Sequence, residues 1–175
     1  MRRMIGVLLA IAGVCAATSA LGGEQAYKTG DIVAFFKQQK VLTATRGICV
    51  GSDEDCAAAD LKDHSRAFDL RINFEKNSAI LSEAARGNLI EFSVALNDPA
   101  LSSLTFAIDG FTDASGGVDG NLKLSQRRAQ SVAAFLRTMG VKDEKLIARG
   151  WGESNFRSED ALDPLNRRVE TRILR

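Results

Sequence analysis

The pattern of apolar and polar residues becomes regular at residue 67. The two kinds of residue first alternate, and a segment follows in which apolar residues recur every three to four positions. The apolar members of the first segment are Phe68, Leu70, Ile72 and Phe74. A period of two that is kept over eight residues predicts a strand with one buried face. Three-to-four spacing then predicts an amphipathic helix, which Ser82 caps and which ends before Pro99. Its apolar positions are Leu81, Ala85, Leu89, Phe92 and Leu96.

The rest of the chain continues this exchange of strands and helices. Alternation predicts a strand over 104–108, and four glycines in 109–120 indicate a loop. A long helix is predicted over 121–139, followed by strands over 146–148 and 169–174 with an irregular stretch between them. The order β-α-β-α-β-loop-β predicts an α/β fold of two layers (α+β), with the helices packed on a mixed four-stranded sheet.

The segment before this pattern has weaker signals. Residues 24–40 hold Ile32, Val33, Phe35 and Phe36 among polar residues, which fits a short amphipathic helix. This helix either docks an envelope protein partner or packs on the rest of the chain. Residues 41–66 show no clear period and are interpreted as a connector.

The first twenty residues have the three-part layout of a secretory signal peptide. A basic start at Arg2 and Arg3 precedes an apolar run of ten residues and then a stretch of small residues. Cleavage after Ala20 or Gly22 is the leading hypothesis. An uncleaved anchor, or lipidation at Cys15, are the alternatives. The sequence therefore divides into 1–20 as signal peptide, 21–66 as N-terminal helix and connector, and 67–175 as the main domain.

Export changes the interpretation of the two remaining cysteines. Cys49 and Cys56 are an even pair, and in an oxidising compartment they are predicted to form a disulfide. Their spacing is not that of a redox C-x-x-C motif. The acidic run between them lacks the spacing of a calcium loop, and His64 is the lone histidine, so no metal site is predicted.

Composition and charge narrow the possible functions. The 175 residues are 45% hydrophobic and 26% charged, which is ordinary for a globular protein. A formal net charge of +1 argues against a nucleic-acid partner. No nucleophile elbow, P-loop or H-E-x-x-H motif is present, so neither an enzymatic activity nor a cofactor is predicted.

The candidate chemistry centres on Arg128 and Asp113. Arg128 stands four residues from both Leu124 and Val132, within the apolar stripe of the long helix. A guanidinium is costly to bury there unless a carboxylate accepts its forked donors. Asp113, in the loop just before this helix, is the candidate. The two charges form either a structural salt bridge or a site for a zwitterion.

Several spaced motifs resemble the OmpA-like C-terminal domain family over about residues 67–175. They are Gly110-Phe111-Thr112-Asp113, Gly116, Asn121, Leu124-Ser125, Arg127-Arg128-Ala129, Gly150-Trp151-Gly152-Glu153 and Asn166-Arg167-Arg168-Val169-Glu170. The resemblance implies non-covalent binding of peptidoglycan in the periplasm through the diaminopimelate of the peptide stem. It implies that Asp113 takes the ammonium of this ligand and that Arg128 takes the carboxylate.

The resemblance also assigns expected roles to neighbouring motif residues. Thr112 and Asp113 are expected to offer backbone N–H groups to the ligand, next to Gly110 and Phe111. Asn121, Leu124 and Ser125 are expected to shape the pocket. Arg168 is expected either to add positive charge or to make a structural contact. Trp151 is expected to pack against its neighbours.

Two departures from the family pattern matter. Phe111 stands where the family usually has histidine, which removes a titratable group from the site. The region before residue 67 is too short for a membrane β-barrel of eight strands, so the expected location is the periplasm, with or without association with the outer membrane. The expected role is envelope tethering or assembly. The alternative is a periplasmic protein-interaction module that does not bind peptidoglycan.

Overall fold

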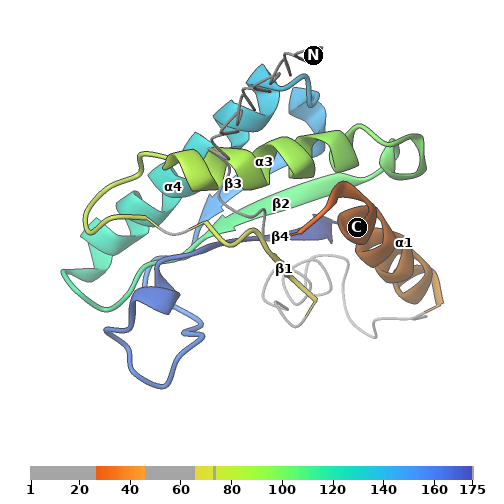
Figure 1. Ribbon diagram of the computed structural model, residues 1–175. Helices are drawn as coiled ribbons and strands as arrows, with labels where there is room; N and C mark the ends of the chain where they lie inside the picture. Colours follow the sequence, from red (N-terminus) through yellow and green to blue (C-terminus); the bar gives the residue numbers. More distant parts are fainter. Residues whose placement is uncertain (1–26, 46–65, 73, 175) are drawn as a thin grey trace, which may run out of the picture.

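The domain has two layers, with two helices on one face of a four-stranded sheet (Figure 1). The computed structural model describes residues 27–45, 66–72 and 74–174. The helices of this layer are α3 (Glu83–Leu96) and α4 (Val118–Thr138). The predicted signal peptide and the predicted Cys49–Cys56 disulfide lie outside the described residues and stay predictions, as does the division of the chain at residues 20 and 66.

The sheet is mixed, as predicted. Its strands are β1 (Phe68–Asp69), β2 (Thr105–Gly110), β3 (Leu146–Gly150) and β4 (Val169–Leu174). They lie in the order β1-β4-β2-β3, with β2 parallel to β3 and antiparallel to β4. β1 pairs antiparallel with β4. Short 3-10 helices occupy η1 (Pro99–Leu101), η2 (Asp143–Lys145) and η3 (Pro164–Asn166).

The first strand is much shorter than the eight-residue alternation predicts. The register pairs with β4 are formed by Phe68 and Asp69, and the Leu70 N–H still donates to Val169 O at 3.2 Å. The strand then ends, because Arg71 has a φ of 48° and interrupts the extended backbone. The Asp69 carboxylate accepts a hydrogen bond from the Arg71 N–H at 2.8 Å, which closes a local turn. Leu70, Ile72 and Phe74 are nevertheless buried. The alternation therefore predicted correctly which side chains of this segment are buried, but it did not predict how far the segment pairs with β4.

The start of α3 agrees with the prediction, whereas the start of α4 was predicted too far along the chain. The Ser82 hydroxyl accepts from the Ala85 N–H at 3.2 Å and caps α3, as predicted. α4 begins at Val118, three residues before its predicted start. Gly120 lies within its first turn, and because glycine is a poor helix former the sequence pattern hides this turn.

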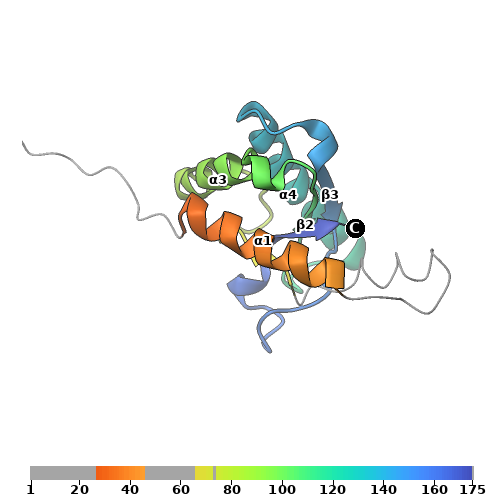
Figure 2. The ribbon, with the colours of Figure 1, turned by 90° about the vertical axis from the view of Figure 1, so that its right-hand side faces the viewer.

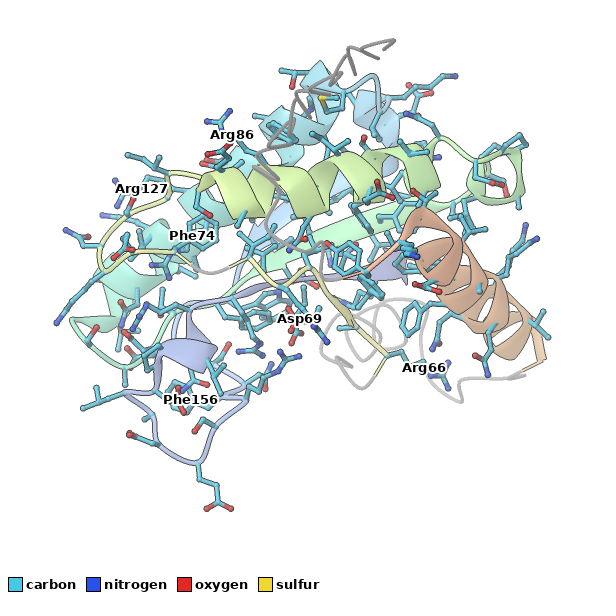
Figure 3. The ribbon with its side chains drawn as sticks, viewed as in Figure 1. Arg66, Asp69, Phe74, Arg86, Arg127 and Phe156 are labelled. Carbon is cyan, nitrogen blue, oxygen red and sulfur yellow. The ribbon has the colours of Figure 1, made fainter. Side chains whose placement is uncertain are left out.

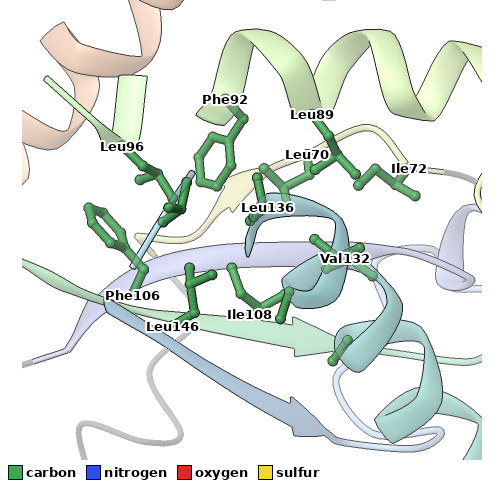
Figure 4. Close-up of a cluster of buried hydrophobic side chains, with 14 of the residues drawn as sticks. Leu70, Ile72, Leu89, Phe92, Leu96, Phe106, Ile108, Val132, Leu136 and Leu146 are labelled. Atoms are coloured by element: carbon green, nitrogen blue, oxygen red, sulfur yellow. The ribbon is translucent and has the colours of Figure 1, made fainter. Parts of the chain in front are cut away.

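The core lies between the helices and the sheet. Figure 4 shows Leu89, Phe92 and Leu96 of α3 facing Phe106 and Ile108 of β2, with Val132 and Leu136 of α4 between them. All seven side chains are fully buried. This packing fixes α4 against β2 and β3 and so fixes the position of the loop that joins β2 to α4.

The N-terminal helix α1 (Thr29–Thr45) packs on this domain. Ile32 and Phe36 are fully buried, and the Phe36 ring meets the Phe106 ring edge to face at 5.0 Å. The Thr29 N–H and hydroxyl donate to the Glu91 carboxylate of α3 at 3.0 and 2.6 Å. Figure 2 shows α1 crossing the end of the domain in front of α3 and β4. Of the two roles that the sequence leaves open, packing is observed, and partner docking stays a prediction.

Candidate functional site

A pocket of about 1080 Å³ lies where β2 ends and α4 begins. Its walls come from the turn at residues 76–77, the loop after β2, the first turns of α4, and Arg167 just before β4. The neighbouring strand β3 runs parallel to β2, so both carboxyl ends lie at this edge of the sheet. Crevices at the carboxyl ends of parallel strands are a common place for ligands.

The structure brings four of the nine predicted ligand-binding residues to this pocket. Asp113, Asn121, Leu124 and Arg128 line it. The other five are buried, do not line the pocket, and pack below or beside it. They are Gly110, Phe111, Thr112, Ser125 and Arg168.

Asp113 is held by hydrogen bonds to both carboxylate oxygens. Oδ1 accepts from the Ser115 N–H at 3.1 Å and from the Ser115 hydroxyl. Oδ2 accepts from Nη1 of Arg167 at 2.8 Å. Burial by itself raises the pKa of Asp113, but the hydrogen bonds from Ser115 and Arg167 outweigh it and bring the pKa below its ordinary value. The side chain is therefore a fixed, ionised carboxylate at neutral pH.

Arg128 is fully buried, and backbone carbonyls rather than a carboxylate hold it. Its Nε donates to Ser78 O at 3.0 Å, Nη1 to Phe111 O at 3.2 Å and Nη2 to Glu75 O at 3.2 Å. The prediction that a carboxylate must accept its donors is therefore wrong, since three loop carbonyls satisfy this need. Among the described residues the ion-pair partner of Asp113 is Arg167, not Arg128. The structural salt bridge considered from the sequence is thus not formed.

The pKa of Arg128 is lowered to about 10, and burial is the main cause. The positive charges of Arg167 and Arg127 contribute to this decrease, whereas the negative charge of Asp113 opposes it. The guanidinium lies over the Phe74 ring at 5.0 Å. At neutral pH it is still charged. Nη1 and Nη2 each carry two N–H groups, and each nitrogen donates one of them to a carbonyl. One N–H group on each nitrogen therefore does not donate to these carbonyls.

Within the Arg167-Arg168 pair, the structure places Arg167 at the pocket and gives Arg168 a structural contact. Arg168 is buried, donates to Glu170 at 2.7 Å and to Asn155 O at 2.9 Å, and lies over the Phe111 ring. It makes the structural contact that was one of its two predicted roles. Arg167, which was not predicted, lines the pocket. Consecutive residues entering a strand point to opposite sides, so the motif predicts one lining arginine but not which one.

Other motif residues join the turn at 150–153 to β2 and α4. The Thr112 N–H donates to Gly152 O at 2.8 Å. This N–H is therefore not available to a ligand, contrary to the prediction. Ser125 Oγ accepts from the Gly152 N–H at 2.8 Å, and Asn121 donates to the Glu153 carboxylate. The Trp151 indole donates to Asp109 at 2.8 Å, in line with a packing role.

Fold and pocket together define the class of this protein. It is a two-layer α/β domain whose pocket lies between the loop after a parallel strand and the start of the following helix. The family model that matches the chain is described as the OmpA family, and it matches residues 73–170, more than half of the sequence. The chain belongs to the OmpA family.

Relatives and solved structures agree with this assignment. "Probable lipoprotein YiaD" of Escherichia coli (strain K12) is 33% identical over 102 residues, which are 57% of this chain and 46% of the relative. "Outer membrane protein A" of Atlantibacter hermannii is 36% identical over 87 residues, which are 50% of this chain and 35% of the relative. This chain thus spans less than half of the length of these two relatives.

The OmpA-like domain of FopA1 from Francisella tularensis subsp. tularensis SCHU S4 superposes with a TM-score of 0.53 at 27% identity. The superposition covers 57% of this chain and 67% of that domain. The C-terminal domain of Helicobacter pylori MotB also reaches 0.53, at 21% identity over 59% of this chain and 83% of its own, and shares the fold. Within the described ranges no group of three or more His, Cys, Asp or Glu side chains could hold a metal, and no helix has the length and apolarity to cross a bilayer.

Proposed function

We propose that this protein binds peptidoglycan non-covalently through the diaminopimelate residue of the peptide stem. The observation that carries the proposal is the presence of an ionised carboxylate, Asp113, and a buried guanidinium, Arg128, in one pocket. Diaminopimelate has an ammonium and a carboxylate on one carbon. Asp113 takes the ammonium, and the remaining N–H groups of Arg128 take the carboxylate.

The fixed geometry of the two charged groups supports this role. Hydrogen bonds hold Asp113 and Arg128 in place without a ligand, so binding does not have to order them. Arg167 already donates to Asp113 and stands beside the pocket as a second cation near the ligand carboxylate. Asn121 and Leu124 form part of the wall, whereas Gly110, Phe111, Thr112, Ser125 and Arg168 support it.

The names of the relatives support a place in the cell envelope. One is named a probable lipoprotein and the other is named outer membrane protein A. We infer that the protein acts in the periplasm, in an envelope tethering or assembly role, and that no enzymatic step is involved. The alternative is an interaction module that binds only protein partners, for which the exposed side of α1 would be one surface.

Co-sedimentation with two kinds of peptidoglycan tests the proposal. One kind carries diaminopimelate at the third stem position and the other carries lysine, which lacks the second carboxylate. We expect the protein to sediment with the first kind at least about ten-fold more strongly, since one charge-assisted bidentate contact is lost with the second. Free meso-diaminopimelate should compete, and free cadaverine, which has two ammonium groups and no carboxylate, should not. Equal sedimentation with both kinds would refute the site, and sedimentation with neither would favour the interaction module.

Binding is expected to be constant between pH 6 and 7.5. No histidine lines the pocket, and Phe111 is fully buried where the family usually has histidine. The pKa of Asp113 lies below its ordinary value, so this group stays ionised as the pH falls to 6. The pKa of Arg128 is about 10, so its charge is lost only as the pH rises through that value. Sedimentation measured at half-unit intervals checks this, and a steep change between pH 6 and 7.5 would contradict it.

A further inference from the structure

The charges that line the pocket are strongly unequal. Five cations face one carboxylate there, and they are Lys76, Lys123, Arg127, Arg128 and Arg167 against Asp113. Residues 67–175 as a whole hold fifteen basic and fifteen acidic side chains, so the excess is local to the pocket. A zwitterion brings no net charge, and diaminopimelate alone would leave this excess uncompensated. The pocket therefore complements a ligand that carries further negative charge.

Three of these cations take no part in holding Asp113 or the pocket walls. Lys76, Lys123 and Arg127, here called the rim cations, are exposed. No carboxylate among the residues that the structure describes forms an ion pair with any of them. Lys123 and Arg127 are four residues apart on α4 and so lie on one face of the helix. Figure 3 shows Arg127 projecting outward from α4 at the end of the domain where Phe74 lies.

The backbone that carries Lys76 is anchored to the site. The flanking carbonyls of Glu75 and Ser78 accept hydrogen bonds from the buried Arg128. The next residue, Asn77, has a φ of 55° and turns the chain here. Lys76 is thus rooted in a turn that the buried guanidinium fixes, while its side chain is exposed at the pocket.

We propose that the rim cations bind further free carboxylates of the peptide stem next to diaminopimelate, so that the protein selects stems whose carboxylates are neither amidated nor cross-linked. The inference rests on the proposed function and deepens it. An unmodified stem carries a glutamate carboxylate before diaminopimelate and a free carboxylate at its C-terminus. Amidation of the glutamate removes the first of these charges, and use of the stem as the carboxyl donor in a cross-link removes the second. Both changes leave the zwitterion of that stem intact.

Isothermal titration of the full chain with two synthetic tripeptides tests this inference. One is L-Ala-γ-D-Glu-meso-diaminopimelate with a free glutamate carboxylate, and the other has this group as the carboxamide. We expect the carboxamide to bind about five-fold more weakly, the upper range for solvent-exposed charge pairs. The double variant Lys76→Gln/Lys123→Gln should bind the free acid about five-fold more weakly and should no longer distinguish the two peptides. Lys37→Gln, on the exposed side of α1, is the matched control and should match the wild type.

The outcomes separate this inference from the proposed function. If both peptides bind equally well and diaminopimelate competes with both, the zwitterion site stands and the role of the rim cations is refuted. If the double variant still distinguishes the peptides, the discrimination arises elsewhere and the inference is equally refuted. If neither peptide binds to the wild type, the proposed function itself fails. Raising the salt concentration should reduce the difference between the peptides, since exposed charges more than about 8 Å apart are screened at 0.15 M.

Discussion

Arg128→Ala is expected to abolish co-sedimentation with peptidoglycan and also to lower the free energy of unfolding by about 3 kcal/mol. The guanidinium is fully buried and donates to the carbonyls of Glu75, Ser78 and Phe111. Its removal leaves these carbonyls without a donor and opens a cavity under the pocket. Urea denaturation, together with sedimentation, measures both effects. A variant that keeps wild-type stability would contradict the structural part of this expectation.

Asp113→Asn separates binding from folding, which Arg128→Ala cannot do. Asparagine keeps the shape and can still accept from Ser115, but it loses the ion pair with Arg167, so the free energy of unfolding should fall by about 2 kcal/mol, less than for Arg128→Ala. Binding should weaken about 100-fold, because the ammonium of the ligand loses its charged partner. Asp143→Asn removes an exposed carboxylate that pairs with Arg137 away from the pocket, and it should bind as the wild type does. Unchanged binding by Asp113→Asn would refute the site.

Gly110→Ala is expected to lower the free energy of unfolding by about 3 kcal/mol or more. Gly110 ends β2 where α4 crosses closely. A Cβ at this position would collide with the Ser125 carbonyl oxygen and lie 3.1 Å from its carbon and 3.3 Å from the Ala129 nitrogen. These are backbone atoms of α4, which cannot move aside as a flexible side chain can. The helix would have to shift away from the sheet and would carry Arg128 with it.

Gly87→Ala is the matched control for this substitution. Gly87 lies within α3, and a Cβ there meets nothing within 4 Å. The variant should raise the free energy of unfolding by about 0.8 kcal/mol, because alanine is the better helix former. Urea denaturation of both variants should therefore show shifts of opposite sign. If Gly110→Ala is as stable as the wild type, the close approach of β2 and α4 is not as tight as the structure has it.

The sequence predicted the elements whose signals are local. The order of strands and helices, the Ser82 cap and the last strand follow from spacing and capping, which depend on neighbours in the chain. The length of the first strand could not be predicted in the same way. Alternating burial at Leu70, Ile72 and Phe74 looks the same in a paired strand and in an unpaired segment that contains a turn, and only the partner β4 separates the two.

For the candidate site, helix phase and the family motifs are sufficient to single out Asp113 and Arg128. They do not show what holds these groups. The carbonyls of residues 75, 78 and 111 and the guanidinium of Arg167 come from segments far apart in the chain, which meet only in the folded domain. The choice of Arg167 over Arg168 depends on which side of β4 faces the pocket, and neighbouring residues in sequence cannot show this.

The amino-acid sequence by itself thus determined the fold class, the family resemblance and the two charged residues of the candidate site, because each depends on residue type and short spacing. Only the tertiary structure decided the strand order β1-β4-β2-β3, the packing of α1 on the domain and the gathering of five cations around Asp113. The physical reason is that these features arise from contacts between distant segments. A chain that is neutral as a whole can therefore form a pocket that is strongly positive.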